Sequence, residues 1–91
     1  MALLEVTCVN HRPSDNTHQG IITLGGRGWS HTRQEAVDNI MNGKHTYFIN
    51  VDGLRSFLRV IHDQKNPFVQ AHHGGVLNDN LLHLGECAID A

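Results

Sequence analysis

Aromatic residues, prolines and long apolar runs are all scarce in this chain of 91 residues, which holds three Phe, one Tyr, one Trp and two Pro. No apolar run approaches the roughly 20 residues that a transmembrane helix needs, so we expect no membrane association. Residues 1–5 lack the basic start and apolar stretch of a secretory signal. With a net charge of −2, the chain also lacks the general basic field of many nucleic-acid-binding proteins. These absences predict a cytoplasmic protein.

Cysteine is scarce too, since the chain has only Cys8 and Cys87. In a reducing cytoplasm both are predicted to be free thiols, and Cys8 falls on the apolar side of its predicted strand. An alternative is a structural zinc site, because Cys8 with His11 and His83 with Cys87 form two pairs at the spacing of metal ligands. We rank this site below two inert thiols and a Cys8–Cys87 disulfide below both. No cofactor is predicted.

The apolar residues that are present recur in periodic runs, which predict one small folded domain spanning residues 1–91. Alternation at Leu4, Val6 and Cys8 predicts a first strand, and a polar loop follows over residues 10–20. Residues 21–24 form a second short strand, antiparallel to the first. Near the C-terminus, Leu81, Leu82 and Leu84 are expected to pack onto this domain as an apolar clasp.

A helix is predicted after Thr32, because Thr32 and Glu35 have the spacing of a capping box. Gly43 stands where a left-handed glycine ends a helix. The apolar stripe of this helix comprises Ala36, Val37, Ile40 and Met41.

The glycine-rich segment before this helix, residues 25–28, is predicted to be a flexible turn. Free amides at a helix start, together with Arg27, would also suit an anion such as phosphate. The glycine spacing does not match the dinucleotide-binding fingerprint, because His31 stands where its third glycine is needed. We therefore keep Arg27 as a candidate anion-binding residue and favour the simple turn.

Two strands, residues 46–51 and 54–63, are predicted to form a hairpin, since Asp52-Gly53 between them is a strong turn signal. A two-residue turn sets Val51 opposite Leu54. After the hairpin, a weaker strand is predicted over residues 68–71. One face of the hairpin is predicted to be core, formed by Tyr47, Ile49, Val51, Leu54, Leu58 and Val60. The order strand-strand-helix-strand-strand-strand predicts an α+β fold, with one helix packed on one face of an antiparallel sheet of four to five strands.

The other face of this hairpin is the main candidate for function, because it sets Phe48 opposite Phe57 with Arg55 and Arg59 on either side. Aromatic residues and arginine dominate protein-binding hot spots, so we expect this face to contact a protein or a second copy of the chain. The same side chains could stack on single-stranded nucleic acid, although the low number of basic residues weakens that alternative. A third interpretation is that another part of the chain covers the face.

The chain resembles a small bacterial family of unassigned role, known as domain of unknown function 3892. The resemblance covers nearly the whole chain and implies the fold but no activity. Gly85 stands where the family usually has proline. Residues 72–74 stand at positions where the family has more acidic residues. The matching positions are Cys8, His18, Gly25, Gly26, Trp29, Thr32, Glu35, Ala36, Gly43, Tyr47, Phe48, Phe68, Asn80, Leu81, Leu82, Leu84 and Cys87.

No enzyme activity is predicted, because the sequence offers no paired carboxylates and no nucleophile with an evident base. Glu35 and Asp52 already have structural roles in a cap and a turn. We predict a non-catalytic module that binds a protein, such as an accessory or phage-type inhibitor protein of a larger complex. The alternatives are a nucleic-acid-associated module and a zinc-stabilised structural module. The candidate binding residues are Phe48, Phe57, Arg55, Arg59 and Arg27.

Overall fold

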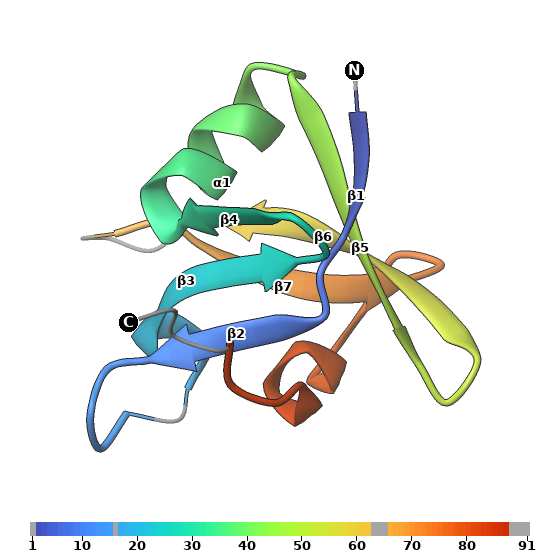
Figure 1. Cartoon of the computed structure of the whole chain (residues 1–91). Helices are drawn as coiled ribbons and strands as arrows, with labels where there is room; N and C mark the ends of the chain where they lie inside the picture. The colour runs from blue at the N-terminus through green and yellow to red at the C-terminus, as the bar shows by residue number, and fades with distance from the viewer. Residues whose placement is uncertain (1, 16, 63–65, 88–91) are drawn as a thin grey trace.

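The protein is described by a computed structural model over residues 2–15, 17–62 and 66–87. It has the predicted α+β fold, with one α-helix and two sheets in this part of the chain (Figure 1). The elements in chain order are β1 (Ala2–Glu5), β2 (Cys8–His11), the 3-10 helix η1 (His18–Gly20), β3 (Ile21–Gly26), β4 (Trp29–Thr32), α1 (Arg33–Met41), β5 (His45–Val51), β6 (Leu54–Ile61), β7 (Phe68–His73), β8 (Val76–Asn78) and the 3-10 helix η2 (Asn80–His83).

The larger sheet has five strands in the order β1-β5-β6-β7-β8, and the smaller has three in the order β2-β3-β4. Strand β1 runs parallel to β5, so the larger sheet is mixed, whereas all the other pairs are antiparallel. The prediction of one antiparallel sheet is therefore wrong. Two strands, β4 and β8, were also not predicted from the sequence. Both are short, and neither has the long alternating pattern that reveals a strand in a sequence.

The predicted first strand is in fact two strands, because the chain passes from one sheet to the other at Val6 and Thr7. The amide of Val6 donates to the carbonyl of Phe48 in the larger sheet at 2.8 Å. The amide of Thr7 donates to the carbonyl of Gly25 in the smaller sheet, also at 2.8 Å. A strand that changes sheets cannot keep one uninterrupted alternation of inward and outward side chains.

This change of sheet turns Cys8 away from the core. Val6 and Val9 are both only 1% exposed, although they are three residues apart. Val9 pairs with the buried Leu24, so the neighbouring pair of Cys8 and Gly25 faces the opposite side of the smaller sheet. The prediction that Cys8 lies on the apolar side of its strand is wrong for this reason.

The core lies between the larger sheet and a layer formed by α1, the smaller sheet and η2 (Figure 1). The larger sheet contributes alternate residues of its central strands, as predicted for the hairpin. Leu54 was predicted to be a core residue, but it lies at the tip of the hairpin and is 38% exposed, so that prediction is wrong. The buried core residues are Val6, Val9, Ile21, Leu24, Ala36, Val37, Tyr47, Ile49, Leu58, Val69, Ala71 and Leu81.

The capping box predicted for α1 is present. The Thr32 hydroxyl accepts from the Glu35 amide at 3.1 Å, and the Glu35 carboxylate accepts from the Thr32 amide at 2.9 Å. Gly43 follows the helix with a φ of +69°, the left-handed conformation expected at a helix end. Met41, predicted to lie on the buried stripe, is 60% exposed because it is the last helical residue.

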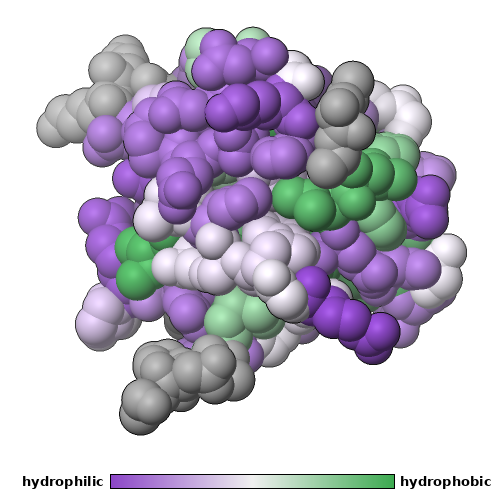
Figure 2. Space-filling model, turned by 45° about the horizontal axis from the view of Figure 1, so that its top comes forward, coloured by the Kyte–Doolittle hydropathy of each residue, from purple (hydrophilic) through white to green (hydrophobic). Residues whose placement is uncertain are grey.

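The surface in Figure 2 is mainly hydrophilic, and its apolar residues form separate areas. Across the described segments, no helix is both long enough and apolar enough to cross a membrane.

His18 in η1 makes the stability of the fold sensitive to pH. Its ring stacks on Phe68 with 6.5 Å between centroids. Burial lowers the pKa of His18 below its ordinary value of 6.5, with Asp79 opposing that change and His11 adding to it. As the pH falls through 6.5, the unfolded chain therefore takes up a proton at this position more readily than the folded chain.

We expect the melting temperature to fall as the pH is lowered from 6.5, because the neutral form of His18 is favoured only in the folded state. Replacing His18 with Gln should make the melting temperature less dependent on pH in this range. Thermal unfolding followed by circular dichroism from about one unit above pH 6.5 to about one unit below it measures the effect. An unchanged slope in the variant would contradict this role.

Candidate binding surface

A row of side chains, one from each strand, crosses the outer face of the larger sheet. In this row Glu5 pairs with Phe48, Phe48 with Phe57, Phe57 with His72, and His72 with Leu77. Side chains at paired positions point to the same face of a sheet. Because the adjacent positions of the central strands are core, this row faces away from α1.

The two phenylalanines at the centre of the row are in contact, as the hairpin register predicted. Their ring centroids lie 6.3 Å apart with the planes tilted by 52°. The guanidinium carbon of Arg55 lies 4.5 Å above the centroid of the Phe48 ring, in a cation–π contact. Phe48 is consequently only 8% exposed, whereas Phe57 is half-buried. Phe57 is therefore the more accessible of the two rings.

Two arginines of β6 flank Phe57, and both are exposed. Arg55 pairs with Asn50 and Arg59 with Gln70. None of the described carboxylates forms an ion pair with either arginine. We call the set Phe48, Arg55, Phe57, Arg59, His72 and Leu77 the outer-face patch. It combines aromatic and apolar surface with two positive charges that no described carboxylate pairs with, on a chain whose net charge is −2.

Arg27 lies apart from this patch, in the turn between β3 and β4 of the smaller sheet. Strand β4 separates the turn from α1, whose N-cap is Thr32. The amides of the glycine-rich turn therefore do not join those of the helix start, which is the combination that the predicted anion site around Arg27 relied on. The sequence was misleading here because β4 is only four residues long.

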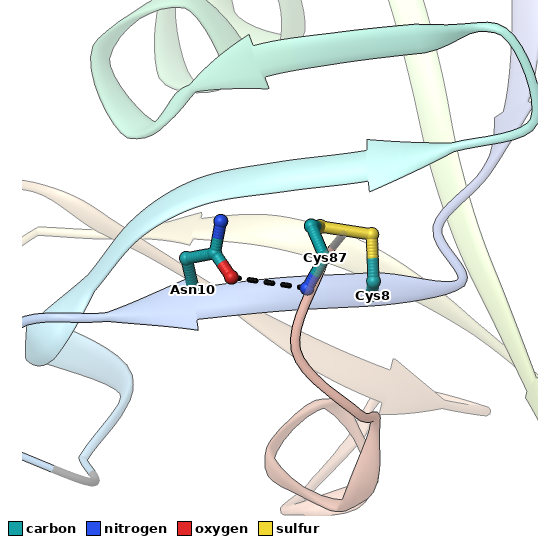
Figure 3. The surroundings of a disulfide bond; sticks show 3 residues. All are labelled: Cys8, Asn10 and Cys87. Atoms are coloured by element: carbon teal, nitrogen blue, oxygen red, sulfur yellow. Dashed lines mark hydrogen bonds between the residues drawn. A yellow bond between two sulfur atoms is a disulfide. The ribbon is translucent and has the colours of Figure 1, made fainter. Parts of the chain in front are cut away.

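The two cysteines form a disulfide between β2 and the C-terminal tail (Figure 3). The prediction of free thiols is wrong, because Cys8 points outward to the place where the tail crosses β2. The disulfide also removes both sulfurs from the zinc site proposed with His11 and His83. Among the described residues, no three His, Cys, Asp or Glu side chains are grouped so as to hold a metal ion.

A pocket of about 420 Å³ lies beside this disulfide. Gly25 forms part of its lining, and a Cβ added there would lie 2.9 Å from the sulfur atoms of both Cys8 and Cys87. A Cβ added at Gly26 would overlap the carbonyl oxygen of Glu5 and the indole nitrogen of Trp29. These two glycines are thus required for close packing and not for a flexible turn. The full lining is Cys8, Gly25, Gly26, Gly28, Trp29, Ser30 and Cys87.

The polar side chains around Tyr47 hold its hydroxyl group in place. The Tyr47 hydroxyl accepts from the Asn39 amide nitrogen at 2.9 Å and lies 2.8 Å from Nδ1 of His31. Burial raises the pKa of Tyr47, while the hydrogen bond from Asn39 opposes this. With its hydroxyl bonded on both sides and its ring buried, Tyr47 is held as a core residue, as its place in the hairpin predicted.

Comparison with known proteins identifies one family. A family model described as "Protein of unknown function (DUF3892)" matches residues 5–85. The matched region includes the whole outer-face patch and Cys8, and it ends before Cys87. No curated protein and no solved structure matches the chain.

Proposed function

Because the chain belongs to the DUF3892 family of proteins of unknown function, we propose its function from its own geometry: it is a non-catalytic module that binds another protein through the outer-face patch. The observation that carries this proposal is the cross-strand row centred on Phe48 and Phe57. The row places Phe48, Phe57 and Leu77, with His72 between them and Glu5 at one end, on a sheet face that lies opposite the core.

The composition of the patch supports protein binding. Tryptophan, tyrosine and arginine supply most protein-binding hot spots, and phenylalanine is enriched in interfaces generally. Phe57 offers a half-open ring, and Arg55 and Arg59 offer charges that no described carboxylate neutralises. A partner with aspartate or glutamate side chains around an apolar anchor would match both features.

The same charges argue against a second copy of this chain as the partner. A two-fold dimer through the patch would bring the two surfaces carrying Arg55 and Arg59 together. Like charges facing each other across an interface are destabilising. Self-association through this face is therefore less favoured than binding to a protein that carries acidic groups.

Single-stranded nucleic acid fits the patch less well. Bases stack on open aromatic faces, and the guanidinium of Arg55 already covers one face of Phe48. Within the patch, Phe57 is the phenylalanine left with a partly exposed ring. Retention on a single-stranded oligonucleotide that is lost at moderate salt would nevertheless favour this alternative.

The proposal that the protein is not an enzyme is supported by the pocket beside the disulfide. Its lining has no aspartate, glutamate, histidine or lysine that could act as an acid or base. A role as an accessory or inhibitor protein of a larger complex is consistent with such a module. The free thiols were predicted from an expected cytoplasmic location, and the disulfide weighs against that location, because disulfides persist in oxidising compartments.

Capture of partners on immobilised protein tests the proposed function. Phe57→Ala should reduce capture of the bound protein about tenfold or more, because the anchor at the centre of the patch is lost. Met41→Ala is the matched control, because Met41 is exposed on α1 and lies outside the patch. Circular dichroism should show both variants folded. Equal capture by wild type and Phe57→Ala would contradict the proposal.

A further inference from the structure

The disulfide lies on the outer side of the smaller sheet and not in the core. Cys8 pairs with Gly25, and Gly25 pairs with Ser30, so these three residues share the face opposite the buried row of Val9 and Leu24. Both cysteines are partly exposed, and both line the open pocket beside Trp29. A small molecule in the pocket would therefore be in direct contact with the sulfur atoms.

The disulfide holds the C-terminal strap, defined as residues 85–87, against the outer edge of β2. Gly85 bridges to Cys8, and its carbonyl accepts from the Val9 amide at 3.0 Å. The Cys87 amide donates to the side-chain oxygen of Asn10 at 3.0 Å (Figure 3). Gly85 itself packs against nothing at its Cβ position. The strap is thus attached to β2 by the disulfide, by the bridge at Gly85 and by the hydrogen bond from Cys87 to Asn10.

Firm anchoring of the C-terminal segment begins just before the strap. Leu81 in η2 is fully buried, whereas Gly85 and Glu86 are exposed. Loss of the covalent bond would therefore leave η2 in place and free only the strap. The Val9 amide would then lose the partner that it has in the strap.

We propose that the pocket is a thiol–disulfide exchange site that takes low-molecular-weight thiols, and that exchange releases the C-terminal strap from β2. The pocket beside the two sulfurs is lined further by Gly25, Gly26, Gly28, Trp29 and Ser30, and this space would hold the incoming thiol. This site is distinct from the outer-face patch, and the proposal does not depend on the proposed function.

The exchange has two steps. In the first, a thiolate attacks the sulfur of Cys87, a new bond forms between them, and the bond to Cys8 breaks with both electrons going to the Cys8 sulfur, which takes up a proton. In the second step, another small-molecule thiolate attacks the small-molecule sulfur of the mixed disulfide. The bond to Cys87 breaks, and the Cys87 thiolate that leaves is also protonated. Two small thiols are oxidised to one disulfide, and the protein disulfide is reduced to two thiols.

Attack at Cys87 follows from the positions of the two cysteines. Cys8 lies within the paired strand β2, whereas Cys87 lies in the strap beyond η2. A mixed disulfide on Cys87 moves outward with the strap and leaves the pairing between β2 and β3 intact.

Titration of the intact protein with glutathione tests this proposal. Mass spectrometry of the acid-quenched mixture should find glutathione on Cys87. Full reduction should speed hydrogen exchange at the Val9 amide about tenfold or more, because that amide loses its partner. Amides in the pairing between β5 and β6 should keep their protection.

Variants at Ser30 test whether the pocket is the route of entry. Ser30→Phe should fill the pocket and slow reduction by glutathione about tenfold, because the rate of exchange depends on access to the disulfide. Ser30→Ala, which leaves the pocket open, should react like the wild type. Equal rates for Ser30→Phe and Ser30→Ala would overturn the assigned site.

Three further outcomes would overturn the proposal. An unchanged Val9 amide after full reduction would show that the strap stays in place without the covalent bond. Loss of protection throughout both sheets would show that the disulfide is needed for the whole fold. A glutathione adduct confined to Cys8 would overturn the direction of attack.

Discussion

Replacing Gly26 with alanine is expected to lower the free energy of unfolding by about 3 kcal/mol, a large effect for the addition of one methyl group. The new Cβ would overlap the backbone carbonyl of Glu5 and the indole nitrogen of Trp29. The carbonyl belongs to the end of β1, where the chain is about to change sheets, so it cannot move without disturbing the pairing of β1 with β5. Urea unfolding followed by Trp29 fluorescence measures the loss.

Gly28→Ala is the matched control for this prediction. Gly28 lies two residues further on, in the turn after β3, with a φ of +80°, and a Cβ added there meets no atom within 4 Å. Its cost is therefore only that of placing alanine in the left-handed region, about 1 kcal/mol. If the two variants were equally stable, steric contact at Gly26 would not be the reason for the glycine pair.

Replacing Leu81 with alanine is the second prediction with a large effect, and about 3 kcal/mol of stability should be lost. Leu81 is fully buried, although it lies in a four-residue 3-10 helix near the C-terminus. The substitution removes a side chain from the layer that η2 places against the larger sheet. Both the lost apolar burial and the cavity left behind destabilise the fold.

Leu82→Ala separates this core role from the general effect of shortening a leucine. Leu82 follows Leu81 in η2 and is only partly buried, so its loss should cost about 1 kcal/mol. Chemical denaturation of both variants gives the comparison. A cost at Leu82 equal to that at Leu81 would mean that η2 does not pack on the core as described.

Local signals in the sequence were sufficient to predict the helix and the central hairpin. The capping box at Thr32 and the glycine at position 43 mark both ends of α1. In the hairpin, Asp52 and Gly53 both adopt positive φ and set the register that opposes Phe48 and Phe57. These elements are predictable because each depends on residues close together in the chain.

The placement of the cysteines could not be predicted, because it depends on contacts that are distant in sequence. The disulfide joins residues separated by 79 positions. Its formation requires the change of sheet at Val6 and Thr7, which continuous alternation through Leu4, Val6 and Cys8 concealed. The spacing of three between the buried Val6 and Val9 is the signal that would have revealed the change.

The candidate surface was predicted at its centre but not at its edges. Phe48, Phe57 and the two arginines follow from the hairpin register alone. His72 and Leu77 join them only through the pairing of β6 with β7 and of β7 with β8. Register across longer connections is not fixed by a turn, so these additions required the structure.

The most direct test of the central claim, that the outer-face patch binds a protein, is an NMR titration of the isotope-labelled domain with the captured partner. The largest chemical-shift changes should fall on the amides of Phe48, Arg55, Phe57 and His72. Arg59→Glu should weaken binding about tenfold or more, because it reverses a charge within the patch. Arg27→Glu, the same change on the smaller sheet, should bind like the wild type. Shift changes centred on the smaller sheet, with equal binding by both variants, would contradict the account.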